Sequence, residues 1–272
     1  MNAIAALRVC NGLVLVGVAL TALETLVSRR DYAPGQILDW EVLKHSWAFT
    51  LRRPLGPVLD RVLGYPGFML LVGVQLLASV AGLWVLLHGG WPRGLDWLVF
   101  VLVLLFNFRS GYGLDGGDQM TGNVLGAICL AGLLPHDPLA LGAALWFLGL
   151  QATLSYLTAG VYKIAGRDWR NGRGLLGVLS TRSYGSPRLS AYLARRPSQA
   201  LAAAWSVIAF ESLFPLAILA GPRGALVFLS IGVVFHLANA AVMGLNNFVW
   251  AFTATYPAVH YCAERMQTLL RG

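Results

Sequence analysis

The sequence predicts an all-α fold, a polytopic integral membrane bundle of about eight transmembrane helices, with short interfacial helices in two longer loops. Of the 272 residues, 57% are hydrophobic and 12% carry a formal charge, and the mean hydropathy is +0.65. An ordinary soluble domain carries roughly 25% charged residues. The apolar residues also gather into runs long enough to cross a bilayer, with Arg-rich loops between several of them.

Eight apolar stretches are long enough to span the bilayer, or nearly so. They are Gly12 to Val27, Gly67 to Gly90, Leu95 to Phe108, Gln119 to Pro135, Leu139 to Tyr162, Gln199 to Gly221, Ala225 to Asn246 and Asn247 to Cys262. Several are marginal in length and no charged residue separates the last two, so six or seven spans also fit. Because no linker or change of composition divides the chain, residues 1–272 are expected to form a single transmembrane domain.

The first stretch is expected to be a retained membrane helix. It lacks a small-x-small cleavage pattern near Ala22, and Glu24 follows. The three cysteines, Cys10, Cys129 and Cys262, stand alone in apolar segments. This pattern predicts buried thiols and implies neither a disulfide nor a zinc site.

Two longer loops, Ser28 to Pro66 and Ile164 to Ser198, carry most of the formal net charge of +8. With eight spans they lie on one side of the membrane, which the positive-inside rule places in the cytoplasm, with both termini outside. Loops this rich in arginine also bind anionic lipid. No basic groove with interleaved aromatic residues is present, so nucleic acid is not an expected partner. The partly amphipathic segments Ile37 to Lys44 and Gly174 to Leu179 predict the interfacial helices.

Lys163 is the first candidate for chemistry. It follows 24 uncharged residues, Leu139 to Tyr162, which as a helix cover about 36 Å and exceed the roughly 30 Å hydrocarbon layer. Lys163 therefore lies near a membrane boundary, where partial desolvation favours the neutral amine and allows it to act as a base or nucleophile. The alternative is a structural lysine whose ammonium extends to the lipid headgroups.

Further polar groups lie inside apolar stretches. Glu211 stands near the middle of one, where a charged carboxylate costs about 2.5 to 3.5 kcal/mol on insertion scales. It is expected to be protonated, or paired with a cation or an imidazole. His236 lies in another stretch, and Asn239 follows on the same helical face. Such a pair can bind a polar ligand head or relay a proton, and a structural polar network is the alternative.

Asp118 follows Gly116 and Gly117 and opens the fourth stretch. An aspartate in this position ordinarily caps a helix and complements its dipole. The glycine pair would also let the backbone approach a ligand closely. The sequence has no metal-ligand spacing such as His-x-x-x-His and no Ser/His/Asp signature, and no metal is expected.

Several segments together resemble a known family. Ala159 to Ile164, followed by Trp169 and Gly172, resembles the active-lysine segment of vitamin K-dependent gamma-glutamyl carboxylases and of the bacterial HTTM (horizontally transferred transmembrane) proteins grouped with them. The other segments similar to that family are Phe235-His236 with Asn239, then Gly244, Phe248 and the run to Pro257, together with Gly116 to Asp118 and Glu211 to Pro215. The resemblance covers most of the chain and is weak outside these motifs.

In the carboxylases the matching lysine deprotonates reduced vitamin K, so that attack by oxygen yields a strong alkoxide base. The resemblance therefore implies that Lys163 is the catalytic base and that the cofactor is a reduced naphthoquinone or a similar isoprenoid quinone. The residues that it implies for binding the quinone or substrate are His236, Asn239, Glu211, Asp118 and Trp169.

The chain departs from the carboxylases in two ways. They have an Asn-His pair near the place of Gly117 and Asp118, and they continue into a large soluble region that binds propeptide and is absent from this sequence. Of the activities that the resemblance implies, carboxylation of a protein is therefore the least expected. Family topology also puts the lysine outside the cytoplasm, opposite to the charge count, so the orientation stays open.

The leading hypothesis is a membrane-embedded, carboxylase-like oxidoreductase that acts with a reduced isoprenoid quinone, with oxygen as a candidate second reactant. The alternative is a non-enzymatic membrane partner, or a maturation or immunity factor for a secreted peptide, and a transporter is the third possibility. In the alternative, Lys163, Glu211 and His236 form a structural network. The candidate partners are membrane lipid, an isoprenoid quinone, a peptide or protein substrate, and a partner membrane subunit.

Overall fold

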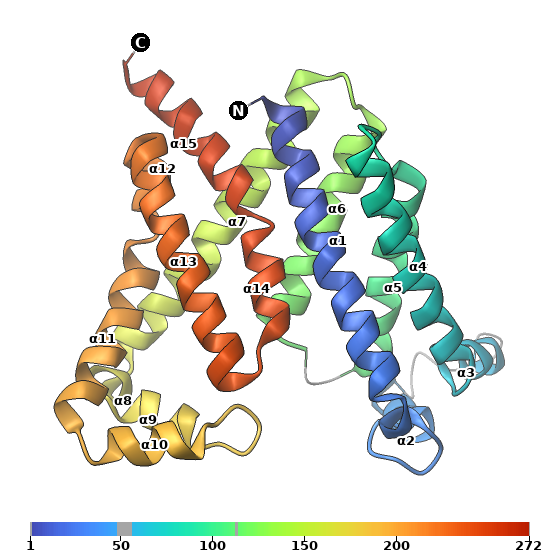
Figure 1. Cartoon of the computed structure of the whole chain (residues 1–272), viewed down its shortest axis with the longest axis horizontal. Coiled ribbons are helices and arrows are strands. Elements are labelled where there is room, and N and C mark those ends of the chain that lie inside the picture. The colour runs from blue at the N-terminus through green and yellow to red at the C-terminus, as the bar shows by residue number, and fades with distance from the viewer. Residues whose placement is uncertain (1, 48–55, 112–113, 272) are drawn as a thin grey trace. The chain divides into compact units, whose positions relative to one another are not determined.

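The computed structural model describes residues 2–47, 56–111 and 114–271, and every regular element within them is a helix (Figure 1). The predicted all-α class is confirmed. Residues 48–55 of the first long loop, and residues 112–113 before the Gly116 to Asp118 segment, lie outside the described residues.

Four helices are long and apolar enough to cross a membrane, one of them near the N-terminus: α1 (Ala3–Val27), α4 (Gly67–Leu87), α7 (Pro138–Ala165) and α13 (Gly221–Met243). They correspond to four of the eight predicted stretches. This count holds for residues 2–47, 56–111 and 114–271. These four helices support the prediction of a membrane protein. The count of eight spans stays a prediction.

The other four predicted stretches are helical but shorter or interrupted. Helices α5 (Arg93–Ser110) and α6 (Gly116–Leu133) have 18 residues each. The sixth stretch divides at Pro215 into α11 (Pro197–Leu213) and α12 (Leu216–Leu219), because proline lacks the amide hydrogen that would continue the helix. The eighth stretch divides into α14 (Asn246–Thr253) and α15 (Tyr256–Arg271), with a proline in the first turn of α15.

The contacts of the chain fall into two compact units. Unit 1 comprises Met1–Cys10 and Pro138–Gly272, and unit 2 comprises Asn11–Asp137. The prediction of a single domain stays a prediction.

In unit 1, α7 packs against α11 and α15, and α13 packs against α12, α14 and α15. Three short helices follow α7 and gather at one end of α11 (Figure 1): α8 (Arg167–Arg170), α9 (Arg173–Leu179) and α10 (Pro187–Ala194). Helix α9 confirms that the Gly174 to Leu179 segment is helical.

In unit 2, α5 packs against both α4 and α6. Asn11 of α1 donates from Nδ2 to both carboxylate oxygens of Asp96 in α5, at 3.0 and 3.1 Å, and both residues are buried. Asp96 lies inside the stretch from Leu95 that the sequence predicts as an apolar span, and the hydrogen bonds from Asn11 compensate its burial there. The sequence pattern did not single out this acidic group.

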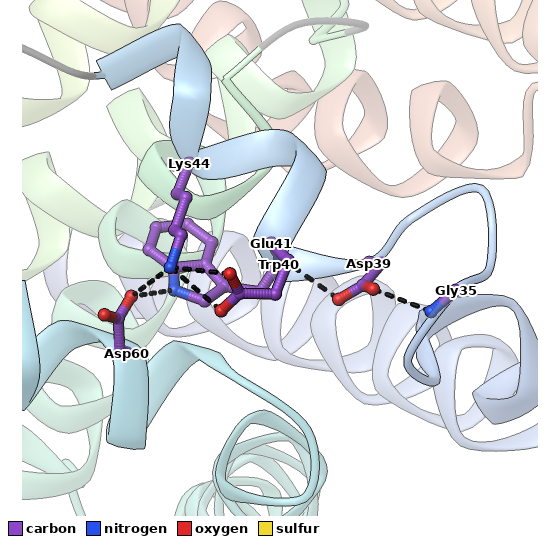
Figure 2. Close-up of polar contacts among 6 residues, drawn as sticks. All are labelled: Gly35, Asp39, Trp40, Glu41, Lys44 and Asp60. Carbon is purple, nitrogen blue, oxygen red and sulfur yellow. Dashed lines mark hydrogen bonds and ion pairs between the residues drawn. The ribbon is translucent and has the colours of Figure 1, made fainter.

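A polar cluster holds the first long loop of unit 2 together (Figure 2). The loop contains η1 (Arg29–Tyr32), α2 (Trp40–Leu43), η2 (Lys44–Trp47) and α3 (Gly56–Leu63). Nζ of Lys44 donates to Glu41 at 2.8 Å and to Asp60 at 3.3 Å, and the indole Nε1 of Trp40 donates to Asp60 at 2.8 Å. The hydrogen bond to Glu41, and next the one to Asp60, raise the pKa of Lys44 above its ordinary value. These bonds join α2 to α3.

Asp39 caps α2 in the same cluster. Its carboxylate accepts hydrogen bonds from the backbone N–H of Gly35 at 2.7 Å and of Glu41 at 3.1 Å (Figure 2). These two donors, that of Gly35 first, hold the pKa of Asp39 below its ordinary value. The cap explains why the predicted Ile37 to Lys44 helix begins only at Trp40.

Candidate functional site

A cavity of about 310 Å³ lies within unit 1, lined by residues from α7, α8, α9, α11, α13 and α14 and from the loop before α14. Its lining is mostly aromatic and aliphatic. The polar residues that line it are Ser155, Tyr156, Lys163, Glu211, His236 and Asn239. The walls therefore suit an apolar ring, with a few polar groups to orient it.

Five of the six site residues predicted from the sequence line this one cavity: Lys163, Trp169, Glu211, His236 and Asn239. The periodicity of two helices accounts for much of this. In α7, Ala159 lies one turn before Lys163, and in α13, Asn239 lies one turn after His236. Each helix thus directs one face toward the same cavity.

Lys163 and Glu211 form an ion pair at the cavity wall. Nζ of Lys163 donates to both carboxylate oxygens of Glu211, at 2.8 and 2.7 Å. The side chains are 19% and 6% exposed. Glu211 therefore has the cation partner that its position in an apolar helix requires. The ammonium is bound by a buried carboxylate, which differs from the alternative in which it extends to lipid headgroups.

The close approach of α7 and α11 makes this pair possible. Gly160 lies one turn before Lys163, and a Cβ atom added to it would stand 2.6 Å from the backbone nitrogen of Ser212. Only a glycine fits this crossing without a shift of one helix. Gly160 therefore brings the backbones together where Lys163 faces Glu211.

Trp169 lies beside the ammonium of Lys163. Nζ is 5.0 Å from the centroid of the indole ring, within the range of a cation–π interaction. The ring packs on Gly174 of α9, where an added Cβ would come within 2.8 Å of a ring atom. The turn between α8 and α9, with Gly172 at a φ of 82°, places Gly174 against the ring.

His236 belongs to a chain of hydrogen bonds that the sequence analysis did not find. Its Nε2 lies 2.5 Å from the hydroxyl oxygen of Tyr156, which lies 2.8 Å from the hydroxyl oxygen of Tyr256. The one signal for Tyr156 in the sequence was its place seven residues before Lys163, two turns away on the same face of α7. Tyr256 approaches α13 closely because Gly232, one turn before His236, carries no side chain.

Asp118 belongs to unit 2, in the first turn of α6. The N-cap of this helix is Asp115, whose carboxylate accepts from the backbone N–H of Gly117 at 2.8 Å and of Asp118 at 3.1 Å. Asp118 accepts in return from the N–H of Asp115 at 3.0 Å. The two aspartates form a capping box, so the capping interpretation of Asp118 accounts for its position. A ligand-binding role for it stays a prediction.

Within residues 2–47, 56–111 and 114–271, no group of three or more His, Cys, Asp or Glu side chains is arranged to hold a metal ion. Comparison of the chain with protein-family models, with curated proteins and with solved structures found no match. The resemblance to the HTTM family therefore stays a hypothesis, and the geometry of the cavity carries the functional argument.

Proposed function

We propose that the protein is a membrane-embedded, carboxylase-like oxidoreductase of about eight spans that binds a reduced isoprenoid quinone in the cavity of unit 1. The observation that carries the proposal is the lining of this cavity, where a lysine–glutamate pair and an imidazole stand among aromatic walls. A hydroquinone head is a flat apolar ring with two hydroxyl groups. Aromatic side chains stack on such a ring, and polar groups bind its oxygen atoms.

The fit is supported by a buried polar atom without a partner. Nδ1 of His236 has no hydrogen-bond partner in the described part of the chain. Buried polar atoms are ordinarily satisfied, and an oxygen atom on a bound ring would satisfy this one. His236, Asn239 and Trp169 would hold the ring, with Lys163 and Glu211 beside it.

Lys163 is the proposed proton acceptor, and Glu211 makes that role possible. An ammonium cannot accept a proton, but the carboxylate of Glu211, bonded to Nζ through both oxygens, can take one from it. The result is a neutral amine beside a neutral acid, and the net charge of the pair stays zero, as an apolar setting favours. Nζ can then accept a proton from a ligand hydroxyl. A bound quinol supplies two electrons and two protons, which dioxygen takes up as hydrogen peroxide when no third reactant is present.

The test is quinol-dependent oxygen consumption by the purified protein in liposomes. Lys163→Ala and Lys163→Arg should each lower the rate about 100-fold or more, because proton transfer by a positioned side chain typically contributes about 10²- to 10⁴-fold and a guanidinium does not release its proton. Lys44 is the only other lysine in the sequence. Lys44→Arg is the matched control and should retain the activity. Full activity in Lys163→Ala would exclude the proposed role.

One observation favours a second function. Lys163 and Glu211 already satisfy each other, as members of a structural network do. In that case the protein is a non-enzymatic membrane partner, or a maturation or immunity factor for a secreted peptide. Replacing Lys163 or Glu211 would then lower the thermal stability of a protein that has no quinol-dependent activity. Measuring unfolding and oxygen consumption on the same variants separates the two functions.

A further inference from the structure

The second long loop, Ile164 to Ser198, carries a surplus of positive charge. It contains seven arginines and one acidic residue, Asp168, whereas the first long loop, Ser28 to Pro66, contains six basic and four acidic residues. Lys44 of the first loop is paired with two of its acids. In the second loop all seven arginines are exposed, and none forms an ion pair with another described residue. The positive charge of the second loop is therefore available to an external anion.

Helix α10 presents part of this charge on one face. Leu193 is buried and Leu189 is partly buried, and both pack in a cluster with residues of α9 and α11. Arg188, Tyr192 and Arg195 are spaced by four and three residues, so they share another face of the helix. All three are exposed there, and Tyr192 is 46% exposed. The packing of the two leucines thus directs an Arg-Tyr-Arg face away from the protein.

Arg196, just beyond α10, stacks on the ring of Tyr192. Its Cζ lies 4.0 Å from the ring centroid, and its Nη1 donates a long hydrogen bond of 3.5 Å to the carbonyl oxygen of Tyr192. Stacking engages the flat face of a guanidinium and leaves the N–H groups along its edge free to donate. Three arginines therefore lie within about one turn of one tyrosine. We name Arg188, Tyr192, Arg195 and Arg196 the Tyr192 cluster.

The Tyr192 cluster lies at the end of a candidate span. Helix α7 is long and apolar enough to cross a membrane, and it ends at Ala165, just past Lys163. Helices α8, α9 and α10 lie beyond this end of α7 (Figure 1). Tyrosine is enriched at the membrane–water interface, where its ring lies at the level of the headgroups. The anion that is abundant at this level is the phosphate of a phospholipid, and basic residues there attract anionic lipids.

We propose that the Tyr192 cluster binds the phosphate group of an anionic phospholipid. A guanidinium donates two parallel N–H groups to two phosphate oxygens, and the stacking on Tyr192 holds Arg196 in place for this contact. Arg188 and Arg195 add positive charge on the same face. The inference goes beyond the proposed function, because it requires neither a ligand in the cavity nor a reaction there.

The chain offers two triple variants that remove equal charge from the same loop. The cluster variant replaces its three arginines by glutamine: Arg188→Gln, Arg195→Gln and Arg196→Gln. The control variant replaces three exposed arginines of α8 and α9: Arg167→Gln, Arg170→Gln and Arg173→Gln. A second pair of variants tests the stacking, since Tyr192→Ala removes the ring and Tyr192→Phe keeps it.

The test is native mass spectrometry of the full chain in a neutral detergent, titrated with phosphatidylglycerol or with zwitterionic phosphatidylcholine. The wild type should bind phosphatidylglycerol more tightly than phosphatidylcholine. The cluster variant should lose about 100-fold in affinity for phosphatidylglycerol, because each basic residue near anionic lipid contributes about fivefold. Tyr192→Ala should lose about fivefold, the share of Arg196. The control variant and Tyr192→Phe should bind as the wild type does.

The remaining outcomes each overturn the inference. Equal affinity of the wild type for the two lipids would show that the cluster does not select an anionic headgroup. An equal loss in the two triple variants would show that only the net charge of the loop matters. Unchanged affinity in Tyr192→Ala contradicts the inference even if the cluster variant does not fold. Displacement of the lipid by inorganic phosphate or by an oligoglutamate peptide at equal concentration would assign the cluster to a soluble anion or to an acidic peptide. None of these results depends on quinol-dependent oxygen consumption, so the two proposals fail separately.

Discussion

Lys163 and Glu211 are each unfavourable alone in an apolar segment, and each is the partner that the other needs. Because a charged carboxylate within an apolar helix is costly, the sequence alone indicates that Glu211 requires a partner. The identity of that partner does not follow from the sequence, because Lys163 is 48 residues away and reaches Glu211 only through the packing of α7 on α11. A lysine near a membrane boundary ordinarily extends to headgroups.

A testable prediction about a single residue concerns Asp39, the capping residue of α2. Its pKa is held below the ordinary value by the N–H groups of Gly35 and Glu41. A lowered pKa means that the carboxylate stabilises the fold above its unfolded pKa of about 3.9, and that this stabilisation is lost as the pH falls through the lower folded value. Amide hydrogen exchange at Gly35 and Glu41 should therefore be several-fold faster in Asp39→Ala than in the wild type at pH 7, and this difference should vanish in strong acid.

The control for this experiment is Asp31→Ala. Asp31 is an exposed acidic residue of the same loop, and its replacement should leave exchange at Gly35 and Glu41 unchanged. Equal exchange in the wild type and Asp39→Ala at neutral pH would contradict the capping role of Asp39.

At the scale of helices, the crossing of α7 and α11 decides the geometry of the cavity. The sequence contains 31 glycines, and small residues let apolar helices approach closely. The pattern does not say which glycine stands at which crossing. The structure assigns that position to Gly160, because an added Cβ would meet the backbone of Ser212.

Two glycines of α7 give a matched comparison. Gly160→Ala should destabilise the protein by about 1 to 3 kcal/mol, the usual cost of overpacking, because α7 must move away from α11. Gly142→Ala should be neutral or stabilising, since its Cβ would meet only the hydroxyl oxygen of Tyr261 at 3.9 Å, and alanine favours the helix. Thermal unfolding in detergent micelles measures both. A Gly160→Ala protein as stable as Gly142→Ala would show that the crossing tolerates a side chain.

At the scale of the whole molecule, the number of spans sets the topology of the loops. Four helices in the described residues meet the length and hydropathy of a span, and the sequence predicts eight. The helices α5 and α6, with 18 residues each, decide between these counts in unit 2. If both cross the membrane, the loop that joins them returns to the side of the first long loop.

Single cysteines introduced at Arg30, Leu114 and His136 test this, after the three buried native cysteines have been replaced by alanine. With eight spans, a membrane-impermeant maleimide should label Arg30→Cys and Leu114→Cys from the same side and His136→Cys from the other. With four spans, Leu114→Cys would instead label together with His136→Cys. The comparison of intact cells with inverted vesicles gives the side of each position.

The sequence alone shows that the chain is helical and apolar, and which segments form its long helices, because composition and run length act locally along the chain. It also singled out Lys163, Glu211, His236 and Asn239, since polar groups in or beside apolar runs need an explanation, and the family resemblance added Trp169. Asp96 was not singled out because it stands at the edge of its apolar stretch.

Which of these residues share a cavity follows only from the packing of the helices against one another. This packing paired Glu211 with Lys163 and joined His236 to Tyr156 and Tyr256. The physical reason is that such partnerships depend on how each helix is rotated about its axis and where it crosses its neighbour. Those quantities are set by packing between segments far apart in the chain, and no local pattern specifies them.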